Sequence, residues 1–192
     1  AGPTDYFLGH ITDPKTGTTI FFSYTNSRVL QFENKKFKEI SFPPINEFSS
    51  NTFFHAEREL FFNITGKTLT WFHPLTQVLT EITLTGISNT DNIHDIATTP
   101  EGFYAAVNNQ VYFITVNGLC KSVCSADEVI YELEHYREKL FYSTPGSVYE
   151  YNTLTGKRKE IFHLDGYTNL QILIHNDVLY LMWWDKLKYA LL

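Results

Sequence analysis

The chain is poor in sulfur-containing residues, in clustered basic residues and in long apolar runs, and each shortage excludes a class of protein. Its 192 residues include two cysteines and one methionine, and the net charge is −6. No apolar run approaches the roughly 20 residues that span a bilayer, so we expect no membrane partner. The lysines and arginines stand singly or in short turn clusters rather than on one basic face, so we expect no nucleic-acid partner.

The two cysteines, Cys120 and Cys124, lie too far apart for a disulfide if the chain between them is a straight strand. Four residues extend about 13 Å, whereas a disulfide requires Cα atoms within about 7 Å, so a bond needs a turn or bulge. We favour a small disulfide that closes a turn in a secreted protein, with two free thiols as the alternative. Two thiols without a second pair or a histidine pair do not complete a tetrahedral metal site.

Aromatic residues, by contrast, are abundant, with 16 Phe and 12 Tyr in the chain. Such side chains favour strands, because they suit a pleated surface. Five apolar doublets or triplets recur at offsets of about 40 residues, each followed by a second aromatic or β-branched strand. They are Ile20-Phe21-Phe22, Leu60-Phe61-Phe62, Phe103-Tyr104-Ala105, Leu140-Phe141-Tyr142 and Leu179-Tyr180-Leu181. A period of this length in short strands is typical of a β-propeller.

We therefore predict an all-β protein, a single β-propeller domain over residues 1–192 with five blades of about 38 to 43 residues. The repeats run approximately over 5–45, 46–86, 90–127, 128–165 and 168–192. Most have four antiparallel strands, the outermost being polar and so protected against pairing with another chain. The fifth repeat lacks a fourth strand. The chain is then either a closed five-bladed ring, which we favour together with a monomer, or a six-bladed ring that lacks a blade.

Two of the repeats, from Asp95 to Val107 and from Leu140 to Asn152, resemble those of a six-bladed superfamily. This superfamily includes low-density-lipoprotein-receptor propellers, calcium-dependent lactonases and arthropod ommochrome-binding proteins. The Phe and Tyr content and doublets such as Ile20-Phe21-Phe22 resemble the ommochrome-binding proteins most closely; these are secreted carriers of an aromatic pigment. The resemblance implies a secreted, non-enzymatic protein that binds a small aromatic ligand or pigment at the mouth of the central channel. The Tyr-Trp-Thr-Asp motif of the receptor family is absent from every repeat.

Aromatic and histidine side chains near the strand entries are candidates for the ligand site. They combine an apolar body with a polar tip, as binding cavities for small planar molecules usually do. The candidates are Tyr6, Phe48, His94, Tyr131, Tyr167, Trp71, Trp183 and Trp184. His10 and His94 fall within first strands, where an imidazole facing the channel can act as acid, base or ligand. The alternative is that these side chains pack between blades.

Acidic residues recur just ahead of the first strands, namely Asp5, Glu47, Asp91 and Asp127. Because the innermost strands of a ring run in the same direction, these carboxylates would gather at one mouth, where oxygen ligands can hold Ca²⁺. A calcium-dependent hydrolase resembling the lactonases is therefore the alternative function, although the same residues are ordinary turn formers. No Gly-x-Ser-x-Gly elbow occurs, so we do not expect a Ser-His-Asp triad. We assign no catalytic residue, favour a protein that is not an enzyme, and expect no cofactor unless the calcium-dependent alternative holds.

Two surface features complete the predictions. Asn63-Ile64-Thr65 is a glycosylation sequon where a strand meets a turn. The segment Phe42-Pro43-Pro44-Ile45 is apolar and stiffened by its prolines, which supports a third function, a protein-recognition scaffold. A connector between blades is the simpler interpretation of the same segment.

Overall fold

The computed structural model describes residues 7–12, 17–23, 28–40, 52–55, 60–73, 76, 78–87, 93–166, 170–183 and 186–192. These residues form strands and turns, and no helix among them is long and apolar enough to cross a membrane. The chain divides into two compact units, Ala1–Leu84 and Thr85–Leu192. The prediction of one domain over residues 1–192 stays a prediction.

The first unit contains two antiparallel sheets of four strands each, in sequential order. One sheet consists of β1 (Phe7–Thr12), β2 (Thr19–Ser23), β3 (Arg28–Glu33) and β4 (Lys36–Ile40). The other consists of β5 (Thr52–His55), β6 (Leu60–Thr65), β7 (Thr68–His73) and β8 (Val78–Thr83). The first strands of the two sheets, β1 and β5, contact each other.

The second unit contains three further antiparallel sheets, the last with three strands. The first consists of β9 (Ile93–Thr99), β10 (Gly102–Val107), β11 (Gln110–Thr115) and β12 (Cys120–Ser125). The next consists of β13 (Glu132–Tyr136), β14 (Lys139–Thr144), β15 (Ser147–Asn152) and β16 (Arg158–His163). The last consists of β17 (Gln171–His175), β18 (Val178–Trp183) and β19 (Lys186–Leu191).

Each of the five sheets lies within one predicted repeat, and the predicted all-β, five-sheet pattern is confirmed. The apolar doublets occupy the second strand of every sheet, and the fifth sheet lacks a fourth strand as predicted. The tight hairpins explain why the repeats fold locally. Asn176 and Asp177, for example, turn between β17 and β18 with φ of 50° and 60°. Asn and Asp tolerate this left-handed backbone better than other residues with side chains.

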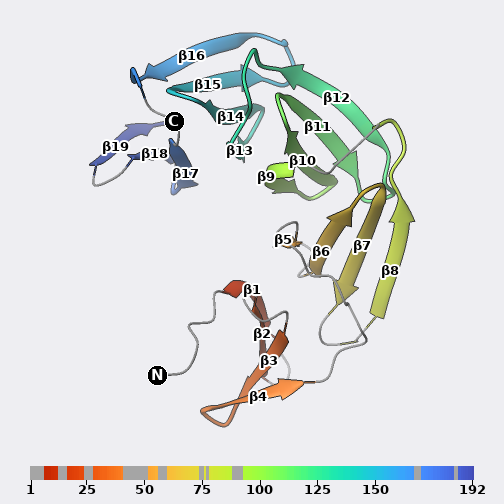
Figure 1. The fold of residues 1–192 in the computed structure, drawn as a ribbon. Coiled ribbons are helices and arrows are strands. Elements are labelled where there is room, and N and C mark those ends of the chain that lie inside the picture. Colours follow the sequence, from red (N-terminus) through yellow and green to blue (C-terminus); the bar gives the residue numbers. More distant parts are fainter. Residues whose placement is uncertain are drawn as a thin grey trace. The chain divides into compact units, whose positions relative to one another are not determined.

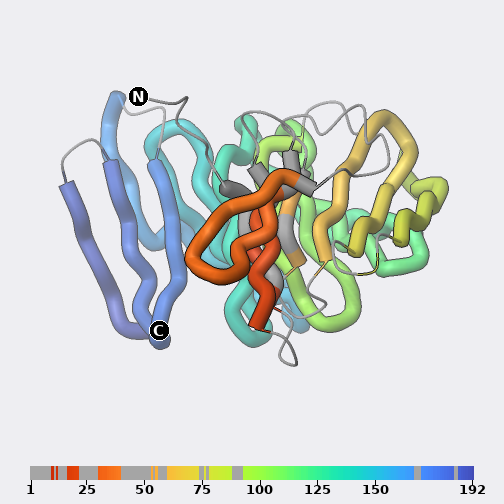
Figure 2. Tube along the Cα trace, turned by 90° about the horizontal axis from the view of Figure 1, so that it is seen from below, coloured from red at the N-terminus to blue at the C-terminus, as the bar shows by residue number. Residues whose placement is uncertain are grey.

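Within the second unit, first strands β9, β13 and β17 lie on the inner side and β12 and β16 on the outer side (Figure 1). Successive sheets pack face to face. One face of the β9–β12 sheet places Ala97 and Val111 against Leu133 and Tyr142 of the next sheet. The opposite face of that next sheet packs against the β17–β19 sheet through a second apolar cluster that includes Phe141 and Trp183. Figure 2 shows the three strands of this last sheet running side by side.

The connector that leads into the second unit is attached to the outer strand of its first sheet. Thr85 forms an isolated parallel bridge with Leu119, in which the Thr85 N–H donates to Gly118 O at 2.9 Å and the Cys120 N–H donates to Thr85 O at 2.8 Å. Gly86 has a φ of 85°, and a Cβ there would lie 2.4 Å from Cys120 O. Only glycine therefore fits this close approach.

The predicted disulfide between Cys120 and Cys124 is wrong, because both cysteines are free thiols. They lie within a single strand, β12, whose pairing with β11 shifts register between Val111 and Tyr112. This irregularity does not reverse the chain, so the two thiols stay on one extended segment. Burial raises the pKa of each thiol to about 11. Both thiols are therefore protonated at neutral pH and poor nucleophiles.

Candidate functional site

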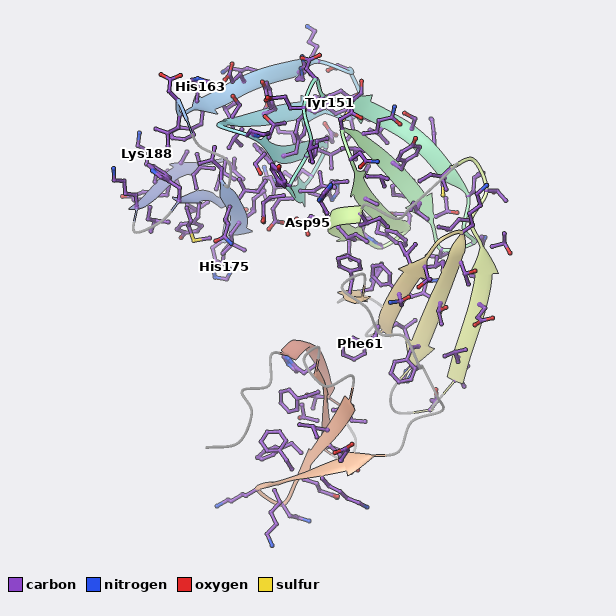
Figure 3. All side chains as sticks on the ribbon, viewed as in Figure 1. Phe61, Asp95, Tyr151, His163, His175 and Lys188 are labelled. Atoms are coloured by element: carbon purple, nitrogen blue, oxygen red, sulfur yellow. The ribbon has the colours of Figure 1, made fainter. Side chains whose placement is uncertain are left out.

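The inner strands of the second unit carry a group of acidic side chains at an otherwise unpaired sheet edge. Asp95 lies in β9 on the inner side of this unit, whereas His163 and Lys188 lie toward its outer side (Figure 3). A first strand has a hydrogen-bonded neighbour on one side only, so its outward-pointing N–H groups need other partners. Carboxylates supply such partners at two places.

Asp95 connects β9 to β13. Its Oδ2 accepts a hydrogen bond from the Leu133 N–H at 2.7 Å, and its Oδ1 accepts one from the Ile96 N–H at 2.8 Å. Burial raises the Asp95 pKa to about 6, although both backbone hydrogen bonds act in the opposite direction. Desolvation of the charged form therefore outweighs two favourable contacts.

Glu134 repeats this arrangement one sheet further along, where it accepts a hydrogen bond from the backbone of Ile174 in β17. Its pKa is raised to about 7, first by burial and then by the nearby charge of Asp95, while the hydrogen bond from Ile174 acts in the opposite direction. The alternation of β13 explains the geometry, because Leu133 and His135 face the preceding sheet. His135 stacks on Tyr104 of that sheet with ring centroids 5.1 Å apart. Glu134 then points toward β17.

Glu132, the first residue of β13, differs from Asp95 and Glu134, because its carboxyl group accepts no such backbone hydrogen bond from a described residue. It makes no hydrogen bond or ion pair with any other described residue. Its pKa rises to about 7 through burial first, and then through the charges of Asp95 and Glu134. Three carboxyl groups that share one small region cannot all ionise easily near neutral pH. Glu132 is the one whose oxygens stay available to a ligand.

His94 and Tyr131 meet at the same end of these strands. Their rings contact edge to face, with centroids 5.7 Å apart and planes inclined by 73°. His94 is exposed and Tyr131 half-buried, and the two directly flank Asp95 and Glu132 in sequence. The structure thus brings together two of the eight predicted ligand-binding residues, and an acidic residue follows each of them in sequence.

The two described tryptophans among the predicted ligand residues are buried against other aromatic rings. Trp71 is 6% exposed and lies against Phe62, with ring centroids 5.0 Å apart. Trp183 is also 6% exposed and lies against Phe162 at 5.4 Å. Trp71 therefore packs within its own sheet and Trp183 between two neighbouring sheets. The remaining candidates lie outside the described residues: Tyr6, Phe48, Tyr167 and Trp184.

The predicted calcium ligands are not brought together among the described residues. Asp127 is exposed and lies 3.7 Å from Arg158, the first residue of the outer strand β16. Its carboxylate is therefore beside an outer strand, not at an inner mouth. The other three, Asp5, Glu47 and Asp91, lie outside the described residues, as does the segment 42–45. In the described part of the chain, no three His, Cys, Asp or Glu side chains converge as metal ligands would.

The sequon asparagine is buried in a central strand. Asn63 is 5% exposed in β6, and its Oδ1 accepts a hydrogen bond from the Thr65 hydroxyl at 2.8 Å. Glycosylation of Asn63 stays a prediction, but the folded strand would have to turn this amide outward to accept a glycan.

A cavity of about 280 Å³ lies at the opposite end of β13, lined by Tyr136, Arg137, Glu138, Lys139 and Leu192. Its aromatic surface is already occupied, because the Arg137 guanidinium lies 4.7 Å from the centre of the Tyr136 ring. The Tyr136 hydroxyl also donates a 2.5 Å hydrogen bond to Asp177. These satisfied contacts favour the His94–Tyr131 end as the candidate ligand site.

Comparisons with known proteins show the fold and no family. No family model and no curated protein sequence matches the chain. Virginiamycin B lyase from Staphylococcus aureus is 10% identical with a TM-score of 0.60, over 94% of this chain and 64% of that protein. The structure of U3-55K is 11% identical with a TM-score of 0.62, over 94% of this chain and 59% of that one.

A third similar structure is the extracellular domain of a hybrid two component system from B. thetaiotaomicron. It is 11% identical with a TM-score of 0.59, over 92% of this chain and 25% of that one. These likenesses and the five antiparallel sheets confirm the predicted β-propeller fold. The chain spans less than two thirds of the length of each of these structures.

Proposed function

We propose that the protein binds a small aromatic ligand that carries an amino group, at the inner strands of the second unit. The observation that supports this most directly is the contact between His94 and Tyr131, which Asp95 and Glu132 follow directly in sequence. Aromatic edges and faces offer a planar molecule favourable contacts, and a carboxylate offers its ammonium group a charge-assisted hydrogen bond. A non-enzymatic secreted carrier of an aromatic pigment, as the resemblance to ommochrome-binding proteins implies, fits this chemistry.

The charge of the site selects the ligand. Asp95 and Glu134 already accept backbone hydrogen bonds, so a ligand meets Glu132 as the carboxyl group without a described partner. A cationic ligand would relieve the repulsion among the three carboxyl groups and favour their ionised forms. An anionic aromatic molecule would add to that repulsion. We therefore expect the protein to discriminate between aromatic ligands by charge.

Tryptamine and indole-3-propionate form a suitable pair of probes, because they share an indole ring and differ in the charge of the side chain. Isothermal titration calorimetry at pH 8 should show that tryptamine binds and that indole-3-propionate binds much more weakly. A charge-assisted hydrogen bond contributes about 1.5 to 3 kcal/mol. Glu132→Gln should therefore weaken tryptamine binding roughly tenfold to a hundredfold. Lowering the pH from 8 to 6 should weaken it as well, because Glu132 takes up a proton.

Glu128→Gln is the matched control, since Glu128 is an exposed carboxyl group close by in sequence. It should leave tryptamine binding unchanged. If neither indole compound binds at millimolar concentration, the ligand proposal is wrong. If both bind equally well and Glu132→Gln has no effect, an aromatic site exists but the amine is not what the carboxyl groups recognise.

A further inference from the structure

The His94 ring comes from a β-bulge in the inner strand β9. The pairing of β9 with β10 shifts register between Ala106 and Val107, so His94 is an extra residue just ahead of Asp95. A bulge interrupts the alternation of side chains along a strand and re-aims the residues beside it. This explains why the side chains of two adjacent residues, His94 and Asp95, both reach the next inner strand, one by a ring contact and the other by a hydrogen bond.

The Tyr131 ring comes from an equivalent bulge at the start of β13. Glu132 pairs with Ser143 of β14, and the Tyr131 N–H donates to the carbonyl oxygen of the same Ser143 at 2.9 Å. Tyr131 and Glu132 therefore oppose a single residue, which is the arrangement of a bulge. Ser143 is the last residue but one of β14, as Ala106 is of β10. The ring contact thus joins two bulges that occupy the same position in successive repeats.

The Asp95 carboxylate connects the two bulges. Its Oδ1 accepts a hydrogen bond from the Ile96 N–H at 2.8 Å, and its Oδ2 accepts one from the Leu133 N–H at 2.7 Å. Ile96 lies two residues after His94, and Leu133 lies two residues after Tyr131. Each carboxylate oxygen therefore holds the backbone close to one of the two rings. All of these residues belong to the second unit.

The third inner strand, β17, carries neither a ring nor a carboxylate at this position. Gln171 pairs with Met182, which is the last residue but one of β18, and Leu170 precedes it. Leu170 is fully buried in the apolar cluster between the last two sheets. Within the second unit, the combination of two rings and a connecting carboxylate therefore belongs to the junction of β9 and β13.

We propose that Asp95 is a positioning residue of the ligand site, which fixes the two bulges to each other and so keeps the His94 and Tyr131 rings in contact. This inference rests on the function proposed above. Asp95 acts through the backbone of its neighbours, since both of its oxygens already accept hydrogen bonds. Glu132, by contrast, meets the ammonium group of the ligand. Positioning of the rings and recognition of charge are thus assigned to different carboxyl groups.

Neutral indole and cationic tryptamine separate these two roles. Asp95→Asn keeps the size of the side chain, but its NH₂ group cannot accept a hydrogen bond, so one N–H group loses its acceptor. The comparison is made at pH 8, where the wild-type carboxyl group with its pKa of about 6 is ionised. Isothermal titration calorimetry should show that Asp95→Asn binds both ligands about tenfold more weakly. Glu132→Gln should weaken the binding of tryptamine but not of indole.

The ring contact can also be measured without any ligand. Nuclear Overhauser effects between ring protons of His94 and Tyr131 are expected in the wild type, because the ring centroids lie 5.7 Å apart. They should be lost in Asp95→Asn. Asp95→Ser is a second variant, whose short hydroxyl can bond to its own backbone but does not reach β13, so it should lose them as well. Asp127→Asn makes the same chemical change beside the outer strand β16 and should alter neither the ring contact nor binding.

Circular dichroism confirms that each variant is folded before the results are compared. Ring contacts that persist in both Asp95 variants would overturn the positioning role. Indole that binds Asp95→Asn as tightly as it binds the wild type would overturn it equally. If neither ligand binds the wild type, the proposed function is wrong, and the ligand-free spectra still decide whether Asp95 holds the two rings together.

Discussion

The sheets β13–β16 and β17–β19 follow the same repeat, yet they differ in the residues of their inner strands and in how their faces are covered within the second unit. The first begins with Glu132 and the second with Gln171, each at the first position of its inner strand. Two positions later stand Glu134 and Leu173. The first sheet thus carries partly buried carboxyl groups and packs on both faces against sheets of the second unit, whereas the strands of the second sheet carry none and pack against that unit on one face only. The same repeat therefore differs in its chemistry according to which inner residues it carries.

The largest difference between the two sheets should appear when equivalent aromatic residues are truncated. Phe141 and Tyr180 occupy equivalent positions in the second strands, but Phe141 is fully buried and Tyr180 only half-buried. Phe141→Ala should reduce the free energy of unfolding by about 3 to 5 kcal/mol, since it opens a cavity between two packed sheets. Tyr180→Ala should cost less than half as much. Urea denaturation of both variants measures the difference.

If the two truncations cost the same, the faces of the two sheets are equally covered in solution. The contrast drawn here between the two sheets would then be wrong.

A second and smaller effect should follow from Glu132→Gln. This change gives β13 the same first residue as β17, which begins with Gln171. The pKa of Glu132 is raised from 4.5 to about 7 in the folded protein, so the folded state binds the proton more tightly than the unfolded state. Wild-type stability should therefore fall as the pH rises from about 4.5 to about 7. The variant lacks this loss and should melt a few degrees higher at pH 8, since 1 kcal/mol shifts the melting temperature of such a chain by roughly 2 to 4 °C.

At pH 4 the two proteins should melt together, because Glu132 is then protonated in both folded and unfolded states. Differential scanning fluorimetry across this pH range measures the effect. Glu128→Gln should give no stabilisation at pH 8. A variant that melts lower than wild type at pH 8 would show that Glu132 gains more from a contact in the folded state than it loses by burial.

The smallest effect concerns the contact between the two sheets at their outer side. The Lys188 ammonium lies 5.0 Å from the Phe162 ring centre and 5.9 Å from that of Trp183. An exposed cation–π contact contributes about 0.5 to 1 kcal/mol, so Lys188→Ala should lower the unfolding midpoint slightly. Lys186→Ala removes a neighbouring exposed lysine and serves as the control. Identical unfolding midpoints for the two variants would show that this contact does not stabilise the packing of the two sheets.

The strands were predictable from the sequence because their signals are local. Doublets such as Leu140-Phe141 and turn residues such as Asn176 identify each hairpin without reference to the rest of the chain. Even the incomplete fifth sheet could be counted in this way. The predicted disulfide was wrong although a local signal argued against it: a bond between Cys120 and Cys124 needs a turn, and residues 121–123 carry no turn signal.

The candidate site was predicted only in part, because it depends on contacts between repeats. His94 and Tyr131 were expected to bind a ligand. Asp95, Glu132 and Glu134 were not predicted, because the predicted acidic ligands were those that precede the first strands. A signal was available in the pattern Glu132-Leu133-Glu134, which puts two acids on one face of an inner strand. What no local pattern shows is that Asp95 accepts a hydrogen bond from Leu133, 38 residues away.

The bridge between Thr85 and Leu119 has a practical consequence for dividing the molecule. Because the connector joins β12 by two backbone hydrogen bonds, the natural start of the second unit is Thr85 and not Ile93, where its first strand begins. A truncated protein that begins at residue 93 would lack Thr85, whose carbonyl oxygen accepts a hydrogen bond from the Cys120 N–H. This N–H of the outer strand would then have no acceptor. A truncated protein that begins at Thr85 keeps this hydrogen bond, and it retains the ligand site together with all three sheets of the second unit.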